Sequence, residues 1–194
     1  TVRDLPIGSK IGTGSPRRIA LLRNIRPDIG IIPIRGNVGT RVAKIDGENY
    51  DGVVVAAAGI TRLGLDNSVA EYLNPEIFTP DVGQGALVVE IRADDQFALK
   101  IASSADHSTS HLAVTAERAF LTTIGGGCNV PITAYAQIAA GRLKVSAMVA
   151  STDGSTLFRE HIYGDTEDPV GTGVELAERL LSSKASTIIE SSRE

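Results

Sequence analysis

Three turns of this sequence carry the residue types that are best suited to bind anions. The first turn, GTGSPRR, lies between a predicted strand and a predicted helix, and its polar residues are Thr13, Ser15, Arg17 and Arg18. Free backbone N–H groups, hydroxyls and guanidinium groups at the start of a helix favour anionic oxygens. A capped helix with two solvated arginines explains this one motif equally well. The GxxxxGK[ST] spacing of a Walker phosphate loop is missing.

Two later turns repeat the arrangement. RGNVGTR contributes Arg35, Gly36, Asn37 and Arg41, and Arg62 follows the run AAAG. Because ligands of an open parallel sheet bind outside the carboxyl ends of its strands, the five arginines are expected to face one crevice. Guanidinium groups so close together repel one another unless an anion lies between them. Pairing with nearby acids explains one such cluster easily and three poorly, so the inferred ligand carries several negative groups.

The single cysteine, Cys128, lies in TIGGGCNVPI behind three glycines. It follows the end of a predicted helix, where the helix dipole disfavours a thiolate, and no histidine has a spacing that identifies a base. These grounds favour a buried, inert cysteine. The three glycines nevertheless leave room for a bulky attached group beside the backbone. A thiol hydrolase is a distant alternative, disfavoured by the absent base.

Two further features have mostly structural interpretations. The stretch GQGA, residues 83–86, forms a tight turn or hinge in which Gln84 is a candidate ligand contact. The stretch ADD, residues 93–95, is interpreted as a helix cap. Two neighbouring acids without further ligands are a weak signal for a metal, so no metal is expected.

Composition excludes several classes of protein. The 194 residues suggest one large domain or two small ones, and 42% hydrophobic with 22% charged residues is ordinary for a globular chain. A formal net charge of -4 gives no global attraction for nucleic acid. No apolar run approaches the ~20 residues of a membrane helix, and the first residues lack a signal-peptide pattern. We expect a cytoplasmic protein with no nucleic-acid or membrane partner.

The first part of the chain predicts an open α/β sheet. Short apolar runs alternate with helix-like segments from Ile7 to about Asp81, which is typical of parallel strands. The run GVVVAAAG has no alternation and predicts a strand that is covered on both faces. A further strand is expected at residues 86–91, and a helix is expected to open at residues 93–95.

The part after Ser108 predicts a small α+β domain. A helix is expected over STSHLAVTAERAFLTTI, ending at Gly125. Its apolar stripe is predicted to consist of Leu112, Ala116, Ala119, Phe120 and Thr123. Three segments of alternating apolar and polar residues then predict a three-stranded antiparallel sheet. A last helix is expected to begin around Pro169.

Six motifs, in their order and spacing, resemble the porphobilinogen deaminase family, also called the hydroxymethylbilane synthases. They are GTGSPRR, RPDI with IRGNVGTR, YDGVVVAAAGITRLG, VGQGALVVEIR, AERAFL and GGGCNVPI. The resemblance covers essentially the whole chain. It implies a transferase of tetrapyrrole and haem biosynthesis that joins four porphobilinogen molecules into hydroxymethylbilane and releases ammonia at each step. It also implies a covalent dipyrromethane cofactor.

The resemblance implies a role for individual residues. Cys128 matches the cysteine that holds the cofactor through a thioether, and an anchoring sulfur that reacts once needs no tuned pKa. The other positions that match cofactor contacts are Thr13, Ser15, Arg17, Arg18, Arg35, Gly36, Asn37, Arg41 and Ala56. The positions expected to bind substrate are Arg17, Arg35, Arg41, Arg62 and Gln84. Gly14 and Pro16 depart from the family's usual GTSSLRR, so one hydroxyl contact is lost.

The resemblance also implies a domain organisation. Residues 1–80 correspond to the family's second domain, a lobe like those of periplasmic binding proteins. Residues 81–107 correspond to a hinge and to a strand and helix that return to the first domain, and residues 108–194 to the C-terminal domain that carries Cys128. Most of the first domain, with its catalytic aspartate, has no counterpart here.

The resemblance therefore predicts that this chain holds no catalytic residue and does not turn over porphobilinogen by itself. A monomer that binds a small-molecule substrate is expected. The alternative is a non-catalytic anion-binding effector module on a similar two-lobed α/β scaffold. Such a module would use the same arginines but would give Cys128 no role.

Overall fold

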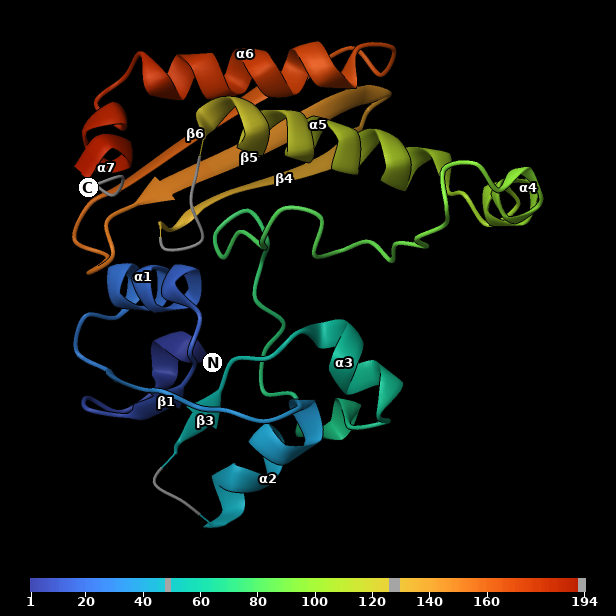
Figure 1. Cartoon of the computed structure of the whole chain (residues 1–194). Helices are drawn as coiled ribbons and strands as arrows, with labels where there is room; N and C mark the ends of the chain where they lie inside the picture. Colours follow the sequence, from blue (N-terminus) through green and yellow to red (C-terminus); the bar gives the residue numbers. More distant parts are fainter. Residues whose placement is uncertain (48–49, 126–129, 192–194) are drawn as a thin grey trace. The chain divides into compact units, whose positions relative to one another are not determined.

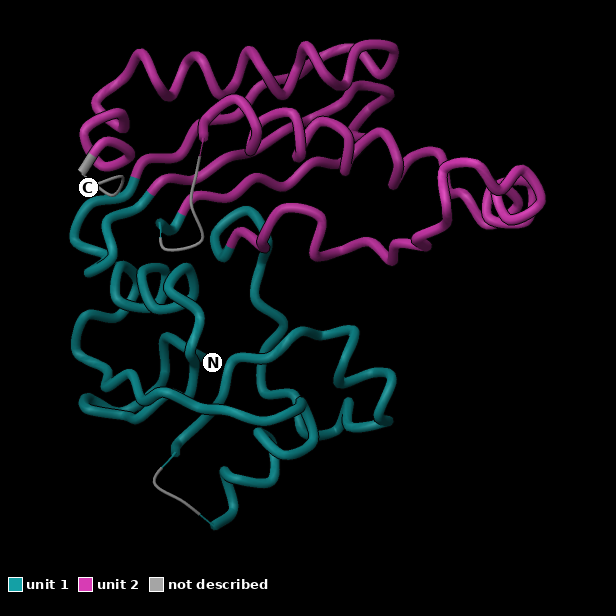
Figure 2. The backbone as a smooth tube through the Cα atoms, viewed as in Figure 1, with its two compact units in different colours: residues 1–78, 128–131, 150–157 teal, residues 79–127, 132–149, 158–194 magenta. Residues whose placement is uncertain are grey.

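The computed structural model describes residues 1–47, 50–125 and 130–191 (Figure 1). The chain divides into two compact units, which Figure 2 distinguishes. Unit 1 contains Thr1–Phe78 and Ala150–Leu157, with the short segment that ends at Pro131, and unit 2 contains the rest. Each unit has a sheet of its own.

Unit 1 is built on a small parallel sheet. Its strands lie in the order β2-β1-β3 and are β1 (Lys10–Gly12), β2 (Gly30–Ile32) and β3 (Gly52–Val53). Ile11 of the central strand lies opposite Ile31 on one side and Gly52 on the other, and both pairings are parallel. A helix follows each strand, and these helices are α1 (Pro16–Ile25), α2 (Val38–Gly47) and α3 (Ala57–Arg62). The predicted alternation of strand and helix is confirmed as far as Arg62, but between there and Asp81 only a short 3-10 helix, η2 (Asp66–Ser68), forms.

Helix α1 begins where the sequence predicts a helix start. Ser15 is its N-cap and accepts a hydrogen bond from the backbone N–H of Arg18, while Pro16 occupies the first turn. Ala20, Leu21 and Leu22 are fully buried. This side of the helix therefore forms part of the core of unit 1.

Arg26, just after α1, holds the first residues of the chain against the end of that helix through hydrogen bonds. Its guanidinium donates to both carboxylate oxygens of Asp28, at 2.6 and 2.7 Å. It also donates to the backbone carbonyls of Val2, Arg3 and Leu5 at 2.8–3.0 Å. Pairing with Arg26 lowers the pKa of Asp28. The short 3-10 helix η1 (Val2–Asp4) is thus tied to the end of α1.

Strand β3 is shorter than the sequence suggests. The run GVVVAAAG predicts one strand covered on both faces, but β3 contains only Gly52–Val53 and α3 begins at Ala57. Residues 52–55 are only half-buried, and residues 56–58 are exposed. The neighbouring strand β1 ends at Gly12, so the run has no further ladder to join, and alanines without a strand partner favour a helix.

The sheet of unit 2 is the predicted three-stranded antiparallel one. Its strands lie in the order β4-β5-β6 and are β4 (Ile132–Ala139), β5 (Arg142–Ala150) and β6 (Leu157–Gly164). The register of the first pair places Ile132 opposite Val149. The turn between them contains Ala140 and Gly141, both with positive φ, as a tight antiparallel hairpin requires.

Two long helices of unit 2, α5 (Ser108–Ile124) and α6 (Pro169–Leu181), lie side by side along the sheet (Figure 1). Asp168 caps α6 by accepting from the N–H of Gly171, and α5 ends at Gly125 with φ 68°. Both predicted boundaries are confirmed. A short helix, α7 (Ser186–Ser191), follows. No helix in the described part of the chain has the length and apolar character needed to cross a membrane.

The buried side of α5 differs in part from the predicted stripe. The buried residues are Ala113, Ala116, Glu117, Phe120 and Ile124, of which only Ala116 and Phe120 were expected. Ala119 and Thr123 are only half-buried, as is Leu112. Helix α5 contacts both α6 and β4, so the face that it buries is rotated from the predicted apolar stripe. This buried face includes the carboxylate of Glu117.

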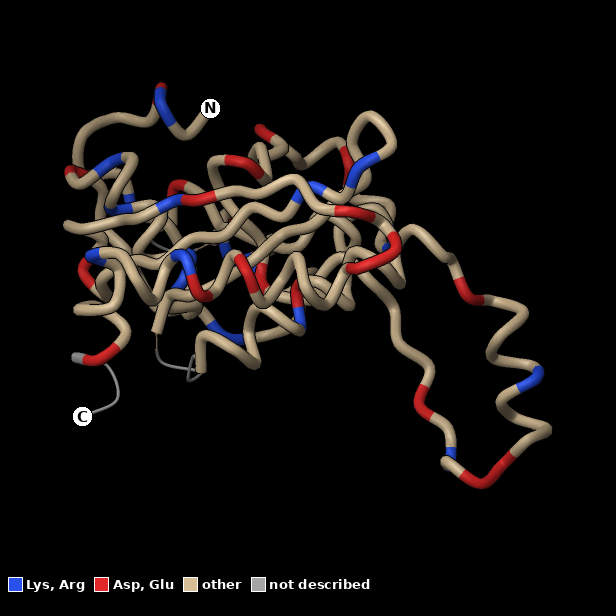
Figure 3. The backbone as a smooth tube through the Cα atoms, turned by 90° about the horizontal axis from the view of Figure 1, so that it is seen from above, with Lys and Arg blue, Asp and Glu red and all other residues tan. Residues whose placement is uncertain are grey.

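The strand predicted at residues 86–91 does not form, and that prediction is wrong for this structure. Leu87, Val88 and Val89 are 88%, 68% and 67% exposed, and no strand among the described residues lies beside them to complete a ladder. The predicted helix start is confirmed, because Asp95 caps α4 (Gln96–Ser103) by accepting from the N–H of Ala98. Figure 3 shows this segment extending away from the sheet of unit 2.

The crossing of α5 and α6 generates a stability prediction. A Cβ at Gly173 would overlap the backbone carbonyl of Ala116, so we expect Gly173→Ala to lower the free energy of unfolding by about 2 kcal/mol. The measurement is chemical denaturation followed by circular dichroism. Val170→Ala, on the exposed side of the same helix, should stay within about 0.5 kcal/mol of the unchanged chain. Equal stabilities of the two variants would contradict the close crossing.

Candidate functional site

The carboxyl ends of the three parallel strands meet at one edge of the unit 1 sheet. Thr13, the first residue after β1, donates its backbone N–H to the carbonyl of Ile32 at 3.0 Å. Val54, the first residue after β3, donates to the carbonyl of Gly12 at 3.2 Å. Because all three strands run in the same direction, the predicted anion-binding turns that follow them lie at this common edge.

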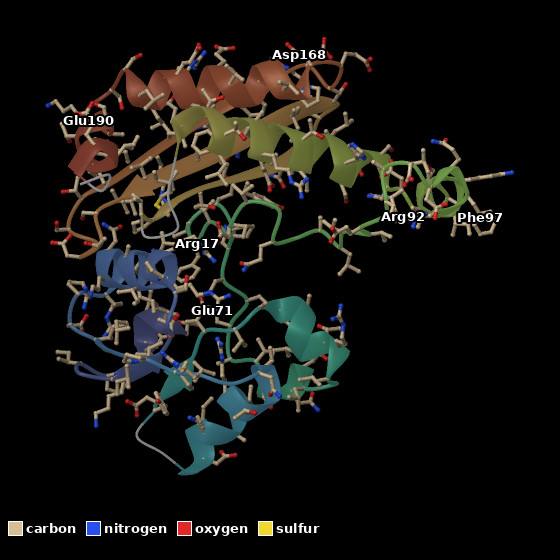
Figure 4. All side chains as sticks on the ribbon, in the orientation of Figure 1. Arg17, Glu71, Arg92, Phe97, Asp168 and Glu190 are labelled. Atoms are coloured by element: carbon tan, nitrogen blue, oxygen red, sulfur yellow. The ribbon has the colours of Figure 1, made fainter. Side chains whose placement is uncertain are left out.

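The first turn is closed by its own hydroxyl groups. Thr13 is 1% exposed, and its Oγ1 accepts from the N–H of Ser15 at 3.3 Å. Arg17, labelled in Figure 4, is only 7% exposed, and Arg18 is half-buried. Arg18 Nη1 donates to the carbonyl of Val54 at 2.7 Å, which links the first turn to the third. The interpretation of two solvated arginines is therefore wrong.

The second turn depends on a glycine. Gly36 has φ 120°, and a Cβ there would come within 2.9 Å of the Thr40 side chain. Asn37 Oδ1 accepts from the backbone N–H of Thr40 at 2.8 Å and from its hydroxyl at 2.9 Å. Arg41 Nε donates to the carbonyl of Gly36 at 2.7 Å. This last bond holds the Arg41 guanidinium against the turn.

The third turn and the start of the second present exposed cations. Arg35 and Arg62 are exposed, as is Ala56, the N-cap of α3. Within the described residues, neither Arg35, Arg41 nor Arg62 forms an ion pair with an acidic side chain. Pairing with nearby acids therefore does not account for these three arginines in this part of the chain. The edge is suited to a ligand with several carboxylate or phosphate groups.

Two predicted site residues remain, Gln84 and Cys128. Gln84 is exposed in unit 2, in the turn that follows Asp81. Cys128 lies outside the described residues, so its role as a cofactor anchor stays a prediction. No group of His, Cys, Asp and Glu residues able to hold a metal ion occurs among the described residues.

Sequence reasoning missed Glu117 of α5. It is 6% exposed, and its carboxylate accepts from the backbone N–H of Gly83 at 2.6 Å and from that of Ala136 at 2.8 Å. A signal was present in the sequence, because Glu117 lies four residues after Ala113 and three before Phe120, on the face that packs inward. Burial raises the pKa of Glu117, and the two backbone N–H donors offset part of that rise.

This shift predicts a pH dependence of stability. Because the pKa of Glu117 is raised above its usual 4.5 in the folded state, its contribution is fully present below about that pH and is lost as the pH rises through the folded value. The free energy of unfolding of the unchanged chain, minus that of Glu117→Gln, should therefore fall with rising pH. Denaturant titrations between pH 4 and 8 measure this difference, in which the other titrating groups cancel. A difference that increased with pH would show that hydrogen bonding outweighs burial.

Two family models match this chain. The model described as "Porphobilinogen deaminase, dipyromethane cofactor binding domain" matches residues 1–100. The model described as "Porphobilinogen deaminase, C-terminal domain" matches residues 111–182. The first match includes all three turns at the sheet edge, and the second includes Cys128 and Glu117.

Curated relatives indicate the same family as the two models. Proteins named porphobilinogen deaminase from Alkaliphilus metalliredigens strain QYMF and Carboxydothermus hydrogenoformans are 45% and 43% identical over 190 residues, which is 98% of this chain. The corresponding protein of Roseiflexus sp. strain RS-1 is 44% identical over 93% of the chain. The matches cover 60%, 61% and 59% of these relatives, so the chain spans about 60% of their length.

Proposed function

The chain belongs to the porphobilinogen deaminase family, and we propose that it supplies the cofactor-binding and substrate-binding part of a hydroxymethylbilane synthase. This transferase of tetrapyrrole and haem biosynthesis joins four porphobilinogen molecules into hydroxymethylbilane and releases ammonia at each addition. The observation that carries the proposal is the edge of the unit 1 sheet, where three arginine-bearing turns meet. Dipyrromethane and the growing product are polyanions, so their charge complements the arginines at this edge.

The arginines recognise the acetate and propionate groups of the pyrrole rings. Their planar guanidinium groups bind a carboxylate through two parallel hydrogen bonds, which fixes the orientation of the ring that carries it. The residues proposed to hold the cofactor are Thr13, Ser15, Arg17, Arg18, Arg35, Gly36, Asn37, Arg41 and Ala56. Those proposed for the substrate are Arg17, Arg35, Arg41, Arg62 and Gln84.

Cys128 is proposed as the covalent attachment point of the cofactor. When it is attached through a thioether, dipyrromethane supplies the free end to which further pyrrole units are added. Buried Arg17 and half-buried Arg18 would neutralise its carboxylates on the side away from water. The exposed Arg35 and Arg62 are available to incoming units.

The domain assignment is part of this proposal. Residues 1–80 form the second domain of the family, with the fold of a periplasmic-binding-protein lobe, and residues 108–194 form its C-terminal domain. Residues 81–107 are the hinge and the segment, including α4, that would return to the first domain. The exposed apolar side chains of this segment support the assignment, since Leu87 is 88% and Phe97 76% exposed. Figure 4 shows Phe97 on α4 pointing away from the sheet of unit 2. We also propose a cytoplasmic monomer.

Replacing the exposed arginines tests the anion site. Arg35→Gln and Arg62→Gln should each weaken the binding of porphobilinogen to the chain by roughly 10-fold, because each removes a charged hydrogen-bonding partner. Isothermal titration calorimetry measures the affinity, which should also fall with added salt. Arg23→Gln, an exposed arginine near the other end of α1, is the matched control and should bind normally. Unchanged affinity in both test variants would place the site elsewhere.

Cofactor attachment tests the role of Cys128. The 194-residue chain alone should form no hydroxymethylbilane, whereas a protein that joins it to the first domain of a relative should be active. The intact mass of that protein should include two linked pyrrole units, located on the Cys128 peptide after digestion. Cys128→Ser is the control and should lack both the added mass and the activity. An unmodified thiol in active protein would refute the anchor and favour another mode of cofactor binding.

A further inference from the structure

A buried carboxylate joins the hinge turn to the open edge of the unit 2 sheet. Glu117 Oε2 accepts from Gly83 and Oε1 from Ala136, so each oxygen serves one backbone N–H. Gly83 belongs to the turn that contains Gln84, and Ala136 belongs to β4. One side chain on α5 therefore connects three separate elements of unit 2.

Strand β4 is an edge strand, and this explains why such a connection is needed. In the order β4-β5-β6 only one side of β4 is paired with a strand within the described residues. Ala136 donates its N–H to Glu117 on its other side, and Thr133 donates its hydroxyl to the carbonyl of Pro80. The turn is thus held alongside β4 at two points. Unpaired edges of this kind require such cover.

The turn itself has a defined shape. Gly83 has φ 69°, the N–H of Gln84 donates to the carbonyl of Asp81 at 3.0 Å, and the N–H of Ala86 donates to that of Gly83 at 3.1 Å. Gln84 is exposed beside Gly83, whereas Thr79, before the turn, is only 2% exposed. After Ala86, the chain leaves the sheet through exposed apolar residues. The hydrogen bond between Gly83 and Glu117 therefore lies where the chain passes from a segment held against β4 to one whose side chains are exposed.

Only a carboxylate suits this position. It is the one side-chain group with two acceptor oxygens and no donor, so it satisfies two N–H groups together. Glutamine would turn its NH₂ group toward one of them. Burying a carboxylate is costly, and a residue with a purely apolar packing role would avoid that cost.

We infer that Glu117 is a positioning residue, which clamps the Gly83–Gln84 turn to β4 and thereby fixes where Gln84 meets the substrate. The clamp is a property of unit 2 alone. Its second consequence rests on the proposed function, because the orientation of Gln84 matters only if porphobilinogen binds there. Glu117 has no direct contact with substrate in this assignment.

Amide exchange in the 194-residue chain tests the clamp without any ligand. In Glu117→Gln at least one of the amides of Gly83 and Ala136, the one that faces the NH₂ group, should exchange roughly 10-fold to 100-fold faster, as expected for the loss of a charged hydrogen bond. The amide of Leu176 in α6 serves as an internal reference and should stay protected. Glu178→Gln, an exposed acid on α6, is the matched control and should change neither rate. Unchanged rates of both Gly83 and Ala136 in Glu117→Gln would overturn the clamp.

A second measurement keeps the inference testable if Glu117→Gln does not fold. In the unchanged chain, the Gly83 amide proton should resonate far downfield and should shift with the same midpoint as the Glu117 carboxyl carbon in an NMR pH titration. A Gly83 resonance that ignores the Glu117 titration would overturn the contact. This test needs no variant.

Affinity for porphobilinogen tests the positioning role. Gln84→Ala and Glu117→Gln should each weaken binding several-fold, and the double variant should bind no more weakly than Gln84→Ala alone. Effects that multiply would show that Glu117 does not act through Gln84, and would overturn the positioning role. If Gln84→Ala binds normally, the substrate role proposed for Gln84 fails and the positioning role fails with it, while the exchange rates still decide the clamp.

Discussion

Parallel pairing of β1 with β2 on one side and with β3 on the other is the constraint on which the candidate site depends. These strands begin at Lys10, Gly30 and Gly52, yet their carboxyl ends lie at one edge. Each strand is only two or three residues long, so the hydrogen bonds that continue past the strands matter as much as the ladder itself. The bond from Arg18 to Val54 joins the turns that follow the adjacent strands β1 and β3.

The same constraint concentrates positive charge in a chain whose net charge is negative. Arg17 is withdrawn from water in the first turn, Arg41 is held against the second, and Arg35 and Arg62 remain exposed. Repulsion among these groups is relieved when carboxylates lie between them, so the edge suits the polyanionic ligand that we propose. The porphobilinogen deaminase family uses ligands of this kind.

Unit 2 meets a different requirement, because the edge of its sheet must be covered and the Gly83 turn must be held in place. Glu117 serves both through its two oxygens. The segment after the Gly83 turn is not covered in this way, since Val88, Val89 and Phe97 expose most of their surface. Local structure there is limited to α4, whose start depends on the Asp95 cap rather than on packing.

The sequence alone determined the features that rest on local chemistry. Ser15 with Pro16, Asp95 and Gly125 each mark a helix boundary through a cap or a left-handed residue, and such signals need no distant partner. The motifs also determined the family. Tertiary structure decided what depends on partners: β3 stops where β1 ends, residues 86–91 form no strand because nothing pairs with them, and Arg17 is buried rather than solvated. Glu117 is the clearest case, because its role arises only when α5, β4 and the Gly83 turn come together, and no local pattern encodes that meeting.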